Sequence, residues 1–272
     1  PLNYITLGSN SPSQTYWASS TELLVGSTAG YTYWDGPVAN TTSIEGGKGN
    51  WTSSNTNWTT SAGTPNSTWS GGTATANFTV TGDTVTVSGT QSIGGLNFEV
   101  TGYSLTNGTS PSLSLAQDST INVTTGTATV APPLTGSFGI TKSGTGVAIL
   151  NCANTYTGST TVSAGTLALG GTSYNGGTFT VGSSGTLRLD NTDIFGSDGT
   201  SPATTFNISG TLASNSSYNK LNILNLTGGS LACNGGKDSS WGCFGLAGAV
   251  TTSGTSQVTT NGSSNFPWKC GD

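Results

Sequence analysis

Short runs in which apolar and polar residues alternate recur along most of the chain, and glycine, asparagine or aspartate separates one run from the next. Alternation with a period of two predicts β-strands with one buried side, because successive side chains of a strand point to opposite faces. The pattern therefore predicts an all-β fold. The residues expected to point inward are Phe78 and Val80, Val85 and Val87, Leu96, Phe98 and Val100, Leu113 and Leu115, Ile121 and Val123, Phe179 and Val181, Leu187 and Leu189, Phe206 and Ile208, Leu224 and Leu226, and Val250.

Equivalent runs recur at intervals of about 18 to 27 residues, which is typical of a solenoid whose loops differ in length. One coil would bury roughly four or five aliphatic side chains at about 1.5–3 kcal/mol each, against the entropy of ordering about twenty residues. A single coil is therefore marginal, and the stacking of coils supplies the stability. We expect a single-domain parallel β-helix.

The clearest unit lies at residues 139–171. It contains the corner Asn154-Thr155-Tyr156-Thr157-Gly158, followed by the runs Thr160-Thr161-Val162 and Thr166-Leu167-Ala168-Leu169. This unit closely resembles the autotransporter-associated β-strand repeat, which is found in the passenger regions of bacterial surface proteins. The resemblance implies a right-handed parallel β-helix that is secreted to the extracellular side of the bacterial cell surface.

The strand before this corner departs from the repeat that it resembles. Aligned on the corner, Ala148 and Leu150 point inward, whereas Val147 and Ile149 point outward. An apolar outward pair predicts a cover, either a tail that folds back or a neighbouring molecule. In addition, Cys152 stands where the family usually has glycine.

Composition divides the chain into a tryptophan-rich segment at 1–72, coils at 73–232 and a cysteine-containing segment at 233–272. We expect both end segments to be aromatic-rich caps, because the open end of a stack must be closed against edge pairing and water. The alternative is a carbohydrate-binding platform of exposed tryptophans, two of which lie in the similar frames Asn50-Trp51-Thr52 and Asn57-Trp58-Thr59. The tryptophans of the first segment are Trp17, Trp34, Trp51, Trp58 and Trp69.

The formal net charge is −5, the pI is about 4.3 and only 6% of residues are charged. A phosphate backbone would be repelled, so nucleic acid is excluded as a partner. No apolar run is long enough to span a bilayer, and we expect no membrane insertion. The chain begins at Pro1 without a signal-peptide core, so we expect a processed or trimmed secreted protein.

Four cysteines permit three pairings, and disulfides are the usual fate of cysteines in a secreted chain. Cys233 and Cys243 bracket a short glycine-rich loop, which favours pairing between them. A tail that folds back along the outside would then join Cys270 to Cys152 and cover Val147 and Ile149.

Histidine is absent, which excludes Ser-His-Asp and Cys-His catalysis and ordinary histidine-bearing zinc sites. The remaining acidic cluster is Asp190, Asp193 and Asp198, a weak calcium candidate. Lyases built on parallel β-helices use such acids beside a basic residue, and Arg188 is the sole arginine. The simpler interpretation is an outward surface pair of Arg188 and Asp190 beside turn aspartates. We expect no catalytic residue and no cofactor.

Threonines also alternate outward and are similar to the arrays of ice-binding solenoids. That function needs a flat Thr-x-Thr array at one coil position, and the unequal coil lengths are expected to spoil the register. The outward pairs are Thr79 and Thr81, Thr84 and Thr86, and Thr178 and Thr180.

The function that we expect is an extracellular, non-catalytic structural protein that assembles head to tail into a surface filament. A β-helix ends in unpaired strand edges, and low charge leaves little repulsion between copies. The alternatives are a passenger fragment of an autotransporter-like adhesin, with a glycan or host-surface ligand, and a polysaccharide-acting enzyme. The residues expected to serve assembly are Tyr4, Ile5 and Leu7 of the run 3–8, Leu23, Leu24 and Val25 of the run 22–26, and Val147 and Ile149.

Overall fold

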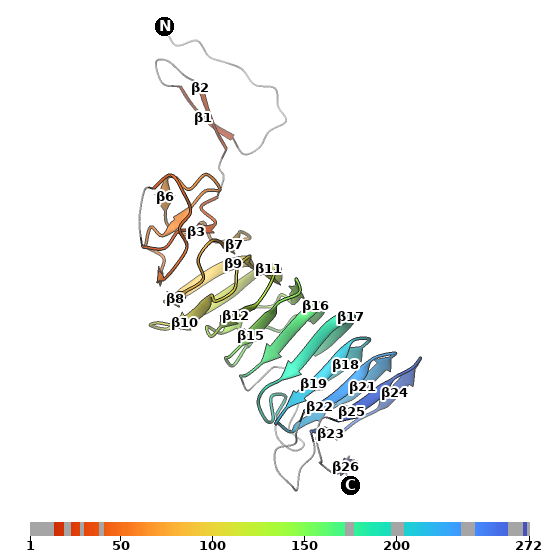
Figure 1. Ribbon diagram of the computed structural model, residues 1–272. Helices are drawn as coiled ribbons and strands as arrows, with labels where there is room; N and C mark the ends of the chain where they lie inside the picture. The colour runs from red at the N-terminus through yellow and green to blue at the C-terminus, as the bar shows by residue number, and fades with distance from the viewer. Residues whose placement is uncertain are drawn as a thin grey trace.

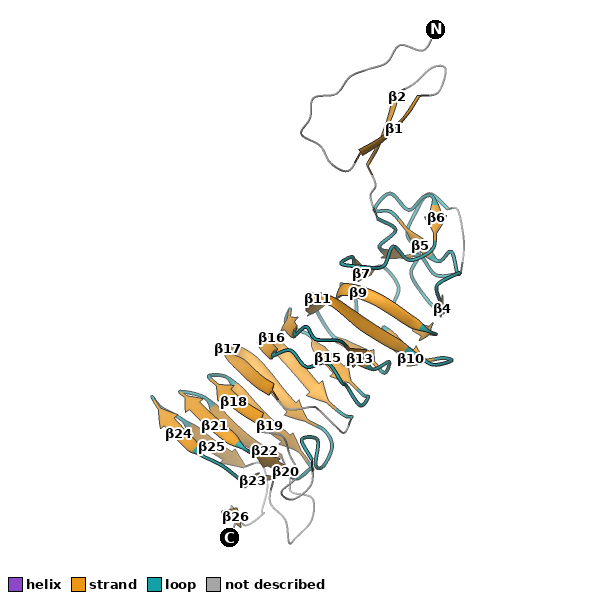
Figure 2. Cartoon of the chain, turned by 180° about the vertical axis from the view of Figure 1, so that it is seen from behind, coloured by secondary structure: helices purple, strands orange, loops and turns teal. Residues whose placement is uncertain are grey.

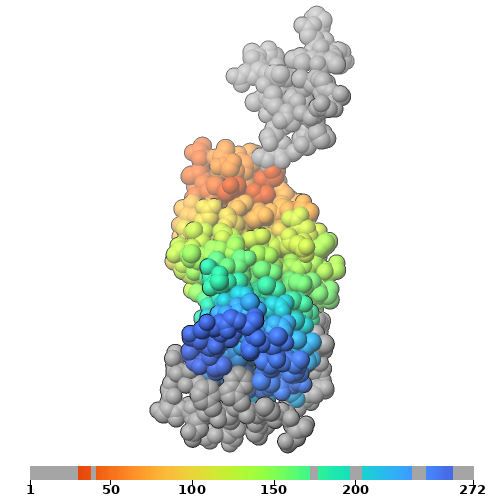
Figure 3. Space-filling view, turned by 90° about the vertical axis from the view of Figure 1, so that its right-hand side faces the viewer, coloured from red at the N-terminus to blue at the C-terminus, as the bar shows by residue number. Residues whose placement is uncertain are grey.

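The computed structural model describes residues 14–18, 23–27, 30–37, 41–171, 177–196, 204–234, 243–260 and 269–270. Every regular element in these ranges is a β-strand, as Figure 1 and Figure 2 show. The same ranges hold no helix that could cross a membrane. In Figure 3 the colours follow one another along the long axis, so successive turns of the chain lie next to each other in sequence order.

The strands form a parallel β-solenoid with three faces, named A, B and C here. Each turn passes from face C to face A to face B, and the long strands β9, β11, β16 and β17 bend from one face to the next. Face A contains β7 (Thr75–Phe78), the second parts of β9 (Thr90–Phe98) and β11 (Ser112–Val123), β14 (Ile140–Ser143), the first parts of β16 (Thr160–Leu169) and β17 (Gly177–Leu189), β18 (Thr204–Ile208), β21 (Ile223–Thr227) and β24 (Val250–Ser253).

The other two faces complete each turn. Face B contains β4 (Gly49–Trp51), β8 (Thr84–Val87), β10 (Ser104–Asn107), β12 (Thr127–Val130), β15 (Val147–Leu150), the second parts of β16 and β17, β19 (Thr211–Asn215), β22 (Ser230–Asn234) and β25 (Gln257–Thr260). Face C contains the first parts of β9 and β11, β13 (Leu134–Thr135) and, as a separate sheet, β20 (Asn219–Leu221), β23 (Phe244–Leu246) and β26 (Lys269–Cys270).

The register of face A stays continuous although the turns differ in length. Ile208 lies beside Val181 and Leu226 lies beside Ile208, so one turn takes 27 residues and the next takes 18. Loops outside the ladder absorb the difference, because the parallel hydrogen bonds fix only the strand positions. The predicted parallel β-solenoid and its uneven spacing are confirmed.

Inward side chains form columns that run from turn to turn. On face B, Leu167, Leu187, Leu212 and Leu231 follow one another in a single column and are at most 1% exposed. Each such side chain contributes roughly 1.5–3 kcal/mol relative to an exposed one, and its partners come from the neighbouring turns. The core is therefore a stack of thin layers, and no turn holds it alone.

Aromatic side chains extend the inward columns of face A. The rings of Phe78 and Phe98 stack with centroids 4.9 Å apart, and those of Phe179 and Phe206 stack at 5.5 Å. Phe195 meets the second pair edge-on, 5.2 Å from Phe179. Stacked and edge-on pairs of this kind add to the energy of burial.

Two predicted inward residues are exposed, and those predictions are wrong. Val80 is 57% exposed with φ of 61°, because β7 ends at Phe78 and the chain turns there. Thr79, predicted to point outward, is 8% exposed instead, and its carbonyl accepts a hydrogen bond from the Tyr103 hydroxyl at 2.7 Å. Val250 occupies the inward column beside Leu224 but is 43% exposed, since β24 is the last described strand of face A.

A lysine occupies one inward position. Lys142 lies in the column between Ile121 and Val162, and its exposed fraction is 0%. Its Nζ donates hydrogen bonds to the carbonyls of Ser143 at 2.5 Å, Gly144 at 2.9 Å and Ala164 at 3.3 Å. Burial lowers its pKa from 10.5 to about 8. Hydrogen bonds to backbone oxygens make such a buried amine tolerable.

The first segment contains two groups of short strands. β1 (Gln14–Ala18) and β2 (Leu23–Ser27) pair antiparallel as a separate two-stranded sheet. β3 (Tyr33–Trp34), β5 (Trp58–Thr59) and β6 (Asn66–Ser67) pair antiparallel, and β3 also joins β7 in parallel. The predicted assembly residues Tyr4, Ile5 and Leu7 lie outside the described residues.

Candidate functional site

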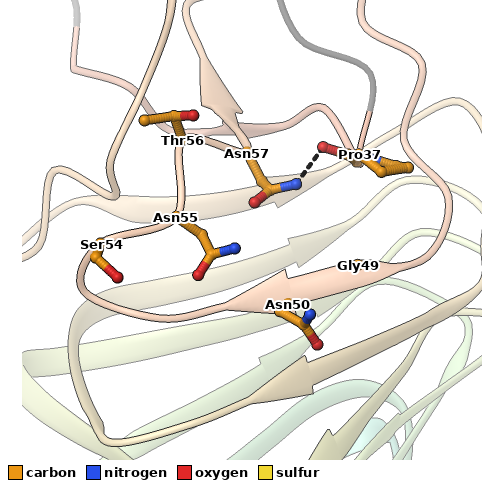
Figure 4. A pocket seen from close by; sticks show the side chains of 8 residues that line it. Pro37, Gly49, Asn50, Ser54, Asn55, Thr56 and Asn57 are labelled. Carbon is orange, nitrogen blue, oxygen red and sulfur yellow. Dashed lines mark hydrogen bonds between the residues drawn. The ribbon is translucent and has the colours of Figure 1, made fainter.

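A polar groove of about 530 Å³ lies beside β4, in the tryptophan-rich first segment. Figure 4 shows its frame, with the loop of Ser54, Asn55, Thr56 and Asn57 on one side and β4 on the other. The side chains of Asn55 and Asn57 turn into the groove. The residues that line it are Gly36, Pro37, Gly49, Asn50, Ser54, Asn55, Thr56 and Asn57.

Side-chain hydrogen bonds hold the groove walls in place. The Asn57 amide donates to the Gly36 carbonyl, which joins the loop to the chain before Pro37. The Thr52 hydroxyl donates to Asn55 Oδ1 and accepts a hydrogen bond from the Asn55 backbone N–H at 3.0 Å. The loop is thus folded on itself by a local side-chain turn.

The Asn-Trp-Thr frames seen in the sequence place indole and amide on opposite sides. In β4, Trp51 is buried and Asn50 is exposed, as strand alternation requires. Trp34, Trp51 and Trp58 are 0% exposed and Trp69 is 9% exposed. A platform of exposed tryptophans is therefore wrong for these four rings. The side chain of Trp17 lies outside what the structure describes.

The buried rings form one aromatic cluster, made of Trp34, Trp51, Trp58 and Trp69. Trp58 meets Trp51 at 4.8 Å and Trp69 at 4.4 Å between centroids, and Phe78 of face A lies 5.7 Å from Trp58. The cluster thus continues directly into the first inward column. Two of its indoles donate to backbone carbonyls, Trp34 to Gly47 at 2.7 Å and Trp69 to Ser92 at 2.8 Å.

Gly49 forms the floor of the groove. A Cβ at this position would lie 2.8 Å from the ring atom Cζ2 of Trp34 and 3.5 Å from Asn57 Nδ2. A side chain here would collide with the tryptophan cluster and fill the groove. Glycine at residue 49 therefore keeps the groove open while the indole packs beneath it.

A buried carboxylate lies close to this region but not among the groove residues. Asp35 accepts hydrogen bonds from the Glu45 backbone N–H at 2.9 Å and from Asn66 Nδ2 at 2.8 Å. Burial is the main cause that raises the pKa of Asp35. Because both oxygens are occupied by chain groups, Asp35 ties loops together and has a structural role.

Arg188 of β17 forms an ion pair with Asp190, which directly follows the strand. Arg188 Nε and Nη2 donate to the two carboxylate oxygens of Asp190, each at 2.7 Å, and Asn215 Nδ2 adds a third contact at 3.1 Å. The hydrogen bonds to Asp190 raise the pKa of Arg188. The outward surface pair predicted from the sequence is present.

The calcium hypothesis for Asp190, Asp193 and Asp198 stays a prediction. Asp190 is engaged by Arg188, Asp193 lies in a turn with φ of 54°, and Asp198 falls outside the described ranges. Among the residues that the structure describes, no three carboxylate or cysteine side chains gather as a metal site.

Cys233 and Cys243 form a disulfide with their Cα atoms 5.6 Å apart, in the pairing that their spacing favours. The predicted link between Cys152 and Cys270 is wrong. Cys152 is a free thiol that donates to Asn154 Oδ1 at 3.1 Å and to the Pro132 carbonyl at 3.4 Å. The reason is distance along the solenoid, since the backbone of Cys270 pairs with Leu246 near the C-terminal end (Figure 1).

The outward valine and isoleucine of β15 keep the predicted direction. Ala148 and Leu150 are buried, whereas Val147 and Ile149 are half-buried on the outside. Val147 lies between Thr127 and Thr166 of the adjoining turns, so neighbouring side chains of face B give it part of its shelter. The predicted assembly role of Val147 and Ile149 stays a prediction, as does that of Leu23, Leu24 and Val25 in β2.

A short outward column of threonines forms on face A, and it ends where Asn207 lies beside Thr180. Thr120, Thr141, Thr161 and Thr180 follow one another in one outward column of face A. The next outward position along these strands holds Asn122 and Ser143, which are linked by a hydrogen bond of 3.1 Å. A repeated Thr-x-Thr array is therefore not formed at these turns.

Comparison with known proteins identifies one repeat in the stack. Residues 140–169 match the passenger-associated-transport-repeat, so the resemblance seen in the sequence is confirmed. The chain is 31% identical over 164 residues to the adhesin BmaC autotransporter of Brucella suis biovar 1 (strain 1330), a match that covers 58% of this chain. The chain spans 5% of the length of that relative. No solved structure matches it.

Proposed function

We propose that this chain is a non-catalytic passenger segment of an autotransporter-type adhesin, exported to the bacterial surface. The observation that carries the proposal is the passenger-type repeat at 140–169. Its strands β14, β15 and β16 occupy the same columns as the turns before and after it. The repeat is thus one layer of a continuous stack, and the similarity to an adhesin autotransporter extends over 58% of the chain.

A stacked solenoid suits an exported surface protein for a physical reason. Its contacts are made mainly between neighbouring turns, so the stack can grow turn by turn. Its core comes from many small layers and does not require one large hydrophobic centre. The right-handed coiling implied by the family resemblance and the capping role of the end segments belong to this proposal.

The test is display on a surface. The chain is fused between a signal peptide and the membrane-anchored translocator of an unrelated autotransporter, and cells are treated with a protease. We expect the chain on intact cells to resist cleavage within residues 73–232 and to increase adherence to host cells or matrix. A displayed, protease-resistant chain with no gain in adherence would refute the adhesive part, and failure of export would refute the passenger part.

Head-to-tail assembly is a second proposal. Val250 and Val258 lie in inward columns of the last described turn, and each is 43% exposed. A solenoid turn of a second copy, stacked on this end, would bury both valines and pair with the open strand edges. A variant with Val250→Asp and Val258→Asp should stay monomeric in sedimentation if this is correct. Unchanged assembly in the variant, or a monomeric parent chain at high concentration, would refute it.

A further inference from the structure

We infer that the groove beside β4 binds a neutral saccharide. This inference deepens the proposed adhesive function and rests on it, since it names the class of ligand. The groove differs from the platform of exposed tryptophans, because the indole of Trp34 lies beneath it and the side chains of Asn55 and Asn57 turn into it. The volume of about 530 Å³ falls within the usual range of ligand sites.

The chemistry of the lining favours a hydroxyl-rich, uncharged ligand. Asn50, Asn55 and Asn57 supply carboxamides, and Ser54 and Thr56 supply hydroxyls. Each carboxamide offers both donors and an acceptor, and each hydroxyl offers both, which matches the mixed donor and acceptor pattern of a sugar ring. No charged side chain is among the described residues that line the groove, so nothing there would pair with an ionic group.

Several of these polar groups remain open to a ligand. Within the described part of the chain, the Asn50 carboxamide makes no hydrogen bond, and Asn50 is exposed. Asn57 Nδ2 donates a hydrogen bond to the Gly36 carbonyl, and Asn55 Oδ1 accepts one from the Thr52 hydroxyl. Asn57 Oδ1 and Asn55 Nδ2 therefore remain available to a ligand. The used atoms fix the side chains, and the remaining atoms face the groove. Such preorganised groups reduce the cost of binding.

The backbone of Gly49 and the ring of Trp34 give the groove a rigid floor. Gly49 presents backbone at the floor, and the ring of Trp34 packs against that backbone. Trp34 is itself fixed by its bond to the Gly47 carbonyl at 2.7 Å. The pyrrolidine ring of Pro37 adds an apolar surface to the lining. The groove therefore combines fixed polar atoms with one apolar contact.

The experiment uses the purified full chain and a panel of neutral and charged oligosaccharides. The neutral probes are maltotriose, cellotriose, mannotriose and chitotriose, and the charged probe is trigalacturonate. Titration calorimetry or ligand-observed NMR should show binding of at least one neutral probe, with Kd on the order of 1 mM or tighter and none for trigalacturonate. Loss of two or three hydrogen bonds in the variant Asn50→Ala/Ser54→Ala should weaken binding about tenfold.

The control is Asn107→Ala, which removes an exposed asparagine on β10 that is not among the residues lining the groove. It should bind as the parent chain does, and both variants should keep the parent's melting temperature. The inference is overturned if no neutral probe binds, if trigalacturonate binds as well as the neutral probes, or if Asn50→Ala/Ser54→Ala leaves the Kd unchanged. Because this test needs no export, failure of display and failure of the groove are separate outcomes.

Discussion

Lys142 lies directly beside Val162 in one inward column of face A, one turn away, and both side chains are 0% exposed. An ammonium group thus occupies a position that its neighbour fills with an aliphatic side chain. The lysine remains there because its Nζ reaches backbone carbonyls at the corner between faces A and B. The arrangement makes the stability of the stack depend on pH.

The pH dependence has a definite sign. Burial lowers the pKa of Lys142 from 10.5 to about 8, so between these values the unfolded chain binds more protons than the folded chain. Stability therefore rises with pH across this window, by about 3 kcal/mol, and the cost of burying the charge is fully present below pH 8.

A Lys142→Met variant isolates this effect in urea unfolding at pH 7 to 10.5. The parent chain should gain stability relative to the variant as the pH rises. The comparison is needed because burial also raises the pKa of Tyr103 and Tyr156. At high pH these two tyrosines ionise more readily in the unfolded chain than in the folded one, which destabilises the fold. Lys48→Met, at an exposed lysine, is the control. A constant difference between parent and Lys142→Met at all pH values would contradict the prediction.

Gly165 in the passenger-type repeat should not tolerate alanine. Its φ is +64°, and a Cβ would lie 2.5 Å from the carbonyl oxygens of Gly144 and Gly146 in the adjoining turn. We expect Gly165→Ala to lower the free energy of unfolding by about 2–4 kcal/mol. Gly72→Ala is the matched control, because φ is +62° there but nothing lies within 4 Å. Gly72→Ala should lower the free energy of unfolding by about 1 kcal/mol. Equal costs in urea unfolding would show that the turns are not this closely packed.

Asparagines link successive turns on the outside of face A. Asn97 donates to Asn77 Oδ1 at 3.0 Å and accepts from Asn122 Nδ2 at 2.7 Å. Asn97→Ala removes both bonds and should cost about 1–2 kcal/mol in thermal or urea unfolding. Asn107→Ala should change stability by less than about 0.5 kcal/mol. An Asn97→Ala chain as stable as its parent would mean that the hydrogen bonds between these asparagine side chains contribute nothing to stability.

Cys152 should react slowly with alkylating reagents. Burial raises the pKa of its thiol from 9.0 to about 11, so at pH 8 the thiolate is about a hundredfold rarer than in the unfolded chain. Peptide mapping after timed iodoacetamide treatment, with and without urea, measures the ratio. Without reduction, the same map should link the Cys233 and Cys243 peptides. Recovery of a Cys152–Cys270 peptide would contradict the structure.

Much of the fold could be predicted from the sequence because burial in a solenoid is local. The alternation at Leu187 and Leu189 identifies the inward side without knowledge of the neighbouring turns. Where alternation ends was harder to predict. Val80 continues the pattern in the sequence, but the chain has already turned at that residue. Lys142 follows Ile140 at the inward period, but a charged side chain is not expected at an inward position, so the pattern alone does not predict its burial.

The groove could be predicted only in part. The repeated Asn-Trp-Thr frames indicate that two asparagines share an environment, and strand alternation separates Asn50 from Trp51. The approach of Gly36 to Asn57 depends on contacts between segments 21 residues apart, which no local pattern reports. The short threonine column was also hard to predict, because turn length in the sequence does not give the register in space.

The turns around the passenger-type repeat stack in parallel. Thr161 and Thr180 are side by side on face A, and Thr161 and Asn207 are two turns apart. Neighbouring parallel strands lie about 4.8 Å apart, within disulfide reach, whereas two turns exceed it. In a Cys152→Ser background, oxidised Thr161→Cys/Thr180→Cys should link the peptides of residues 161 and 180 by mass spectrometry, in addition to the native Cys233–Cys243 pair. Oxidised Thr161→Cys/Asn207→Cys should show the native pair but no link between the peptides of residues 161 and 207. Linkage of the second pair, or of neither, would contradict the stack.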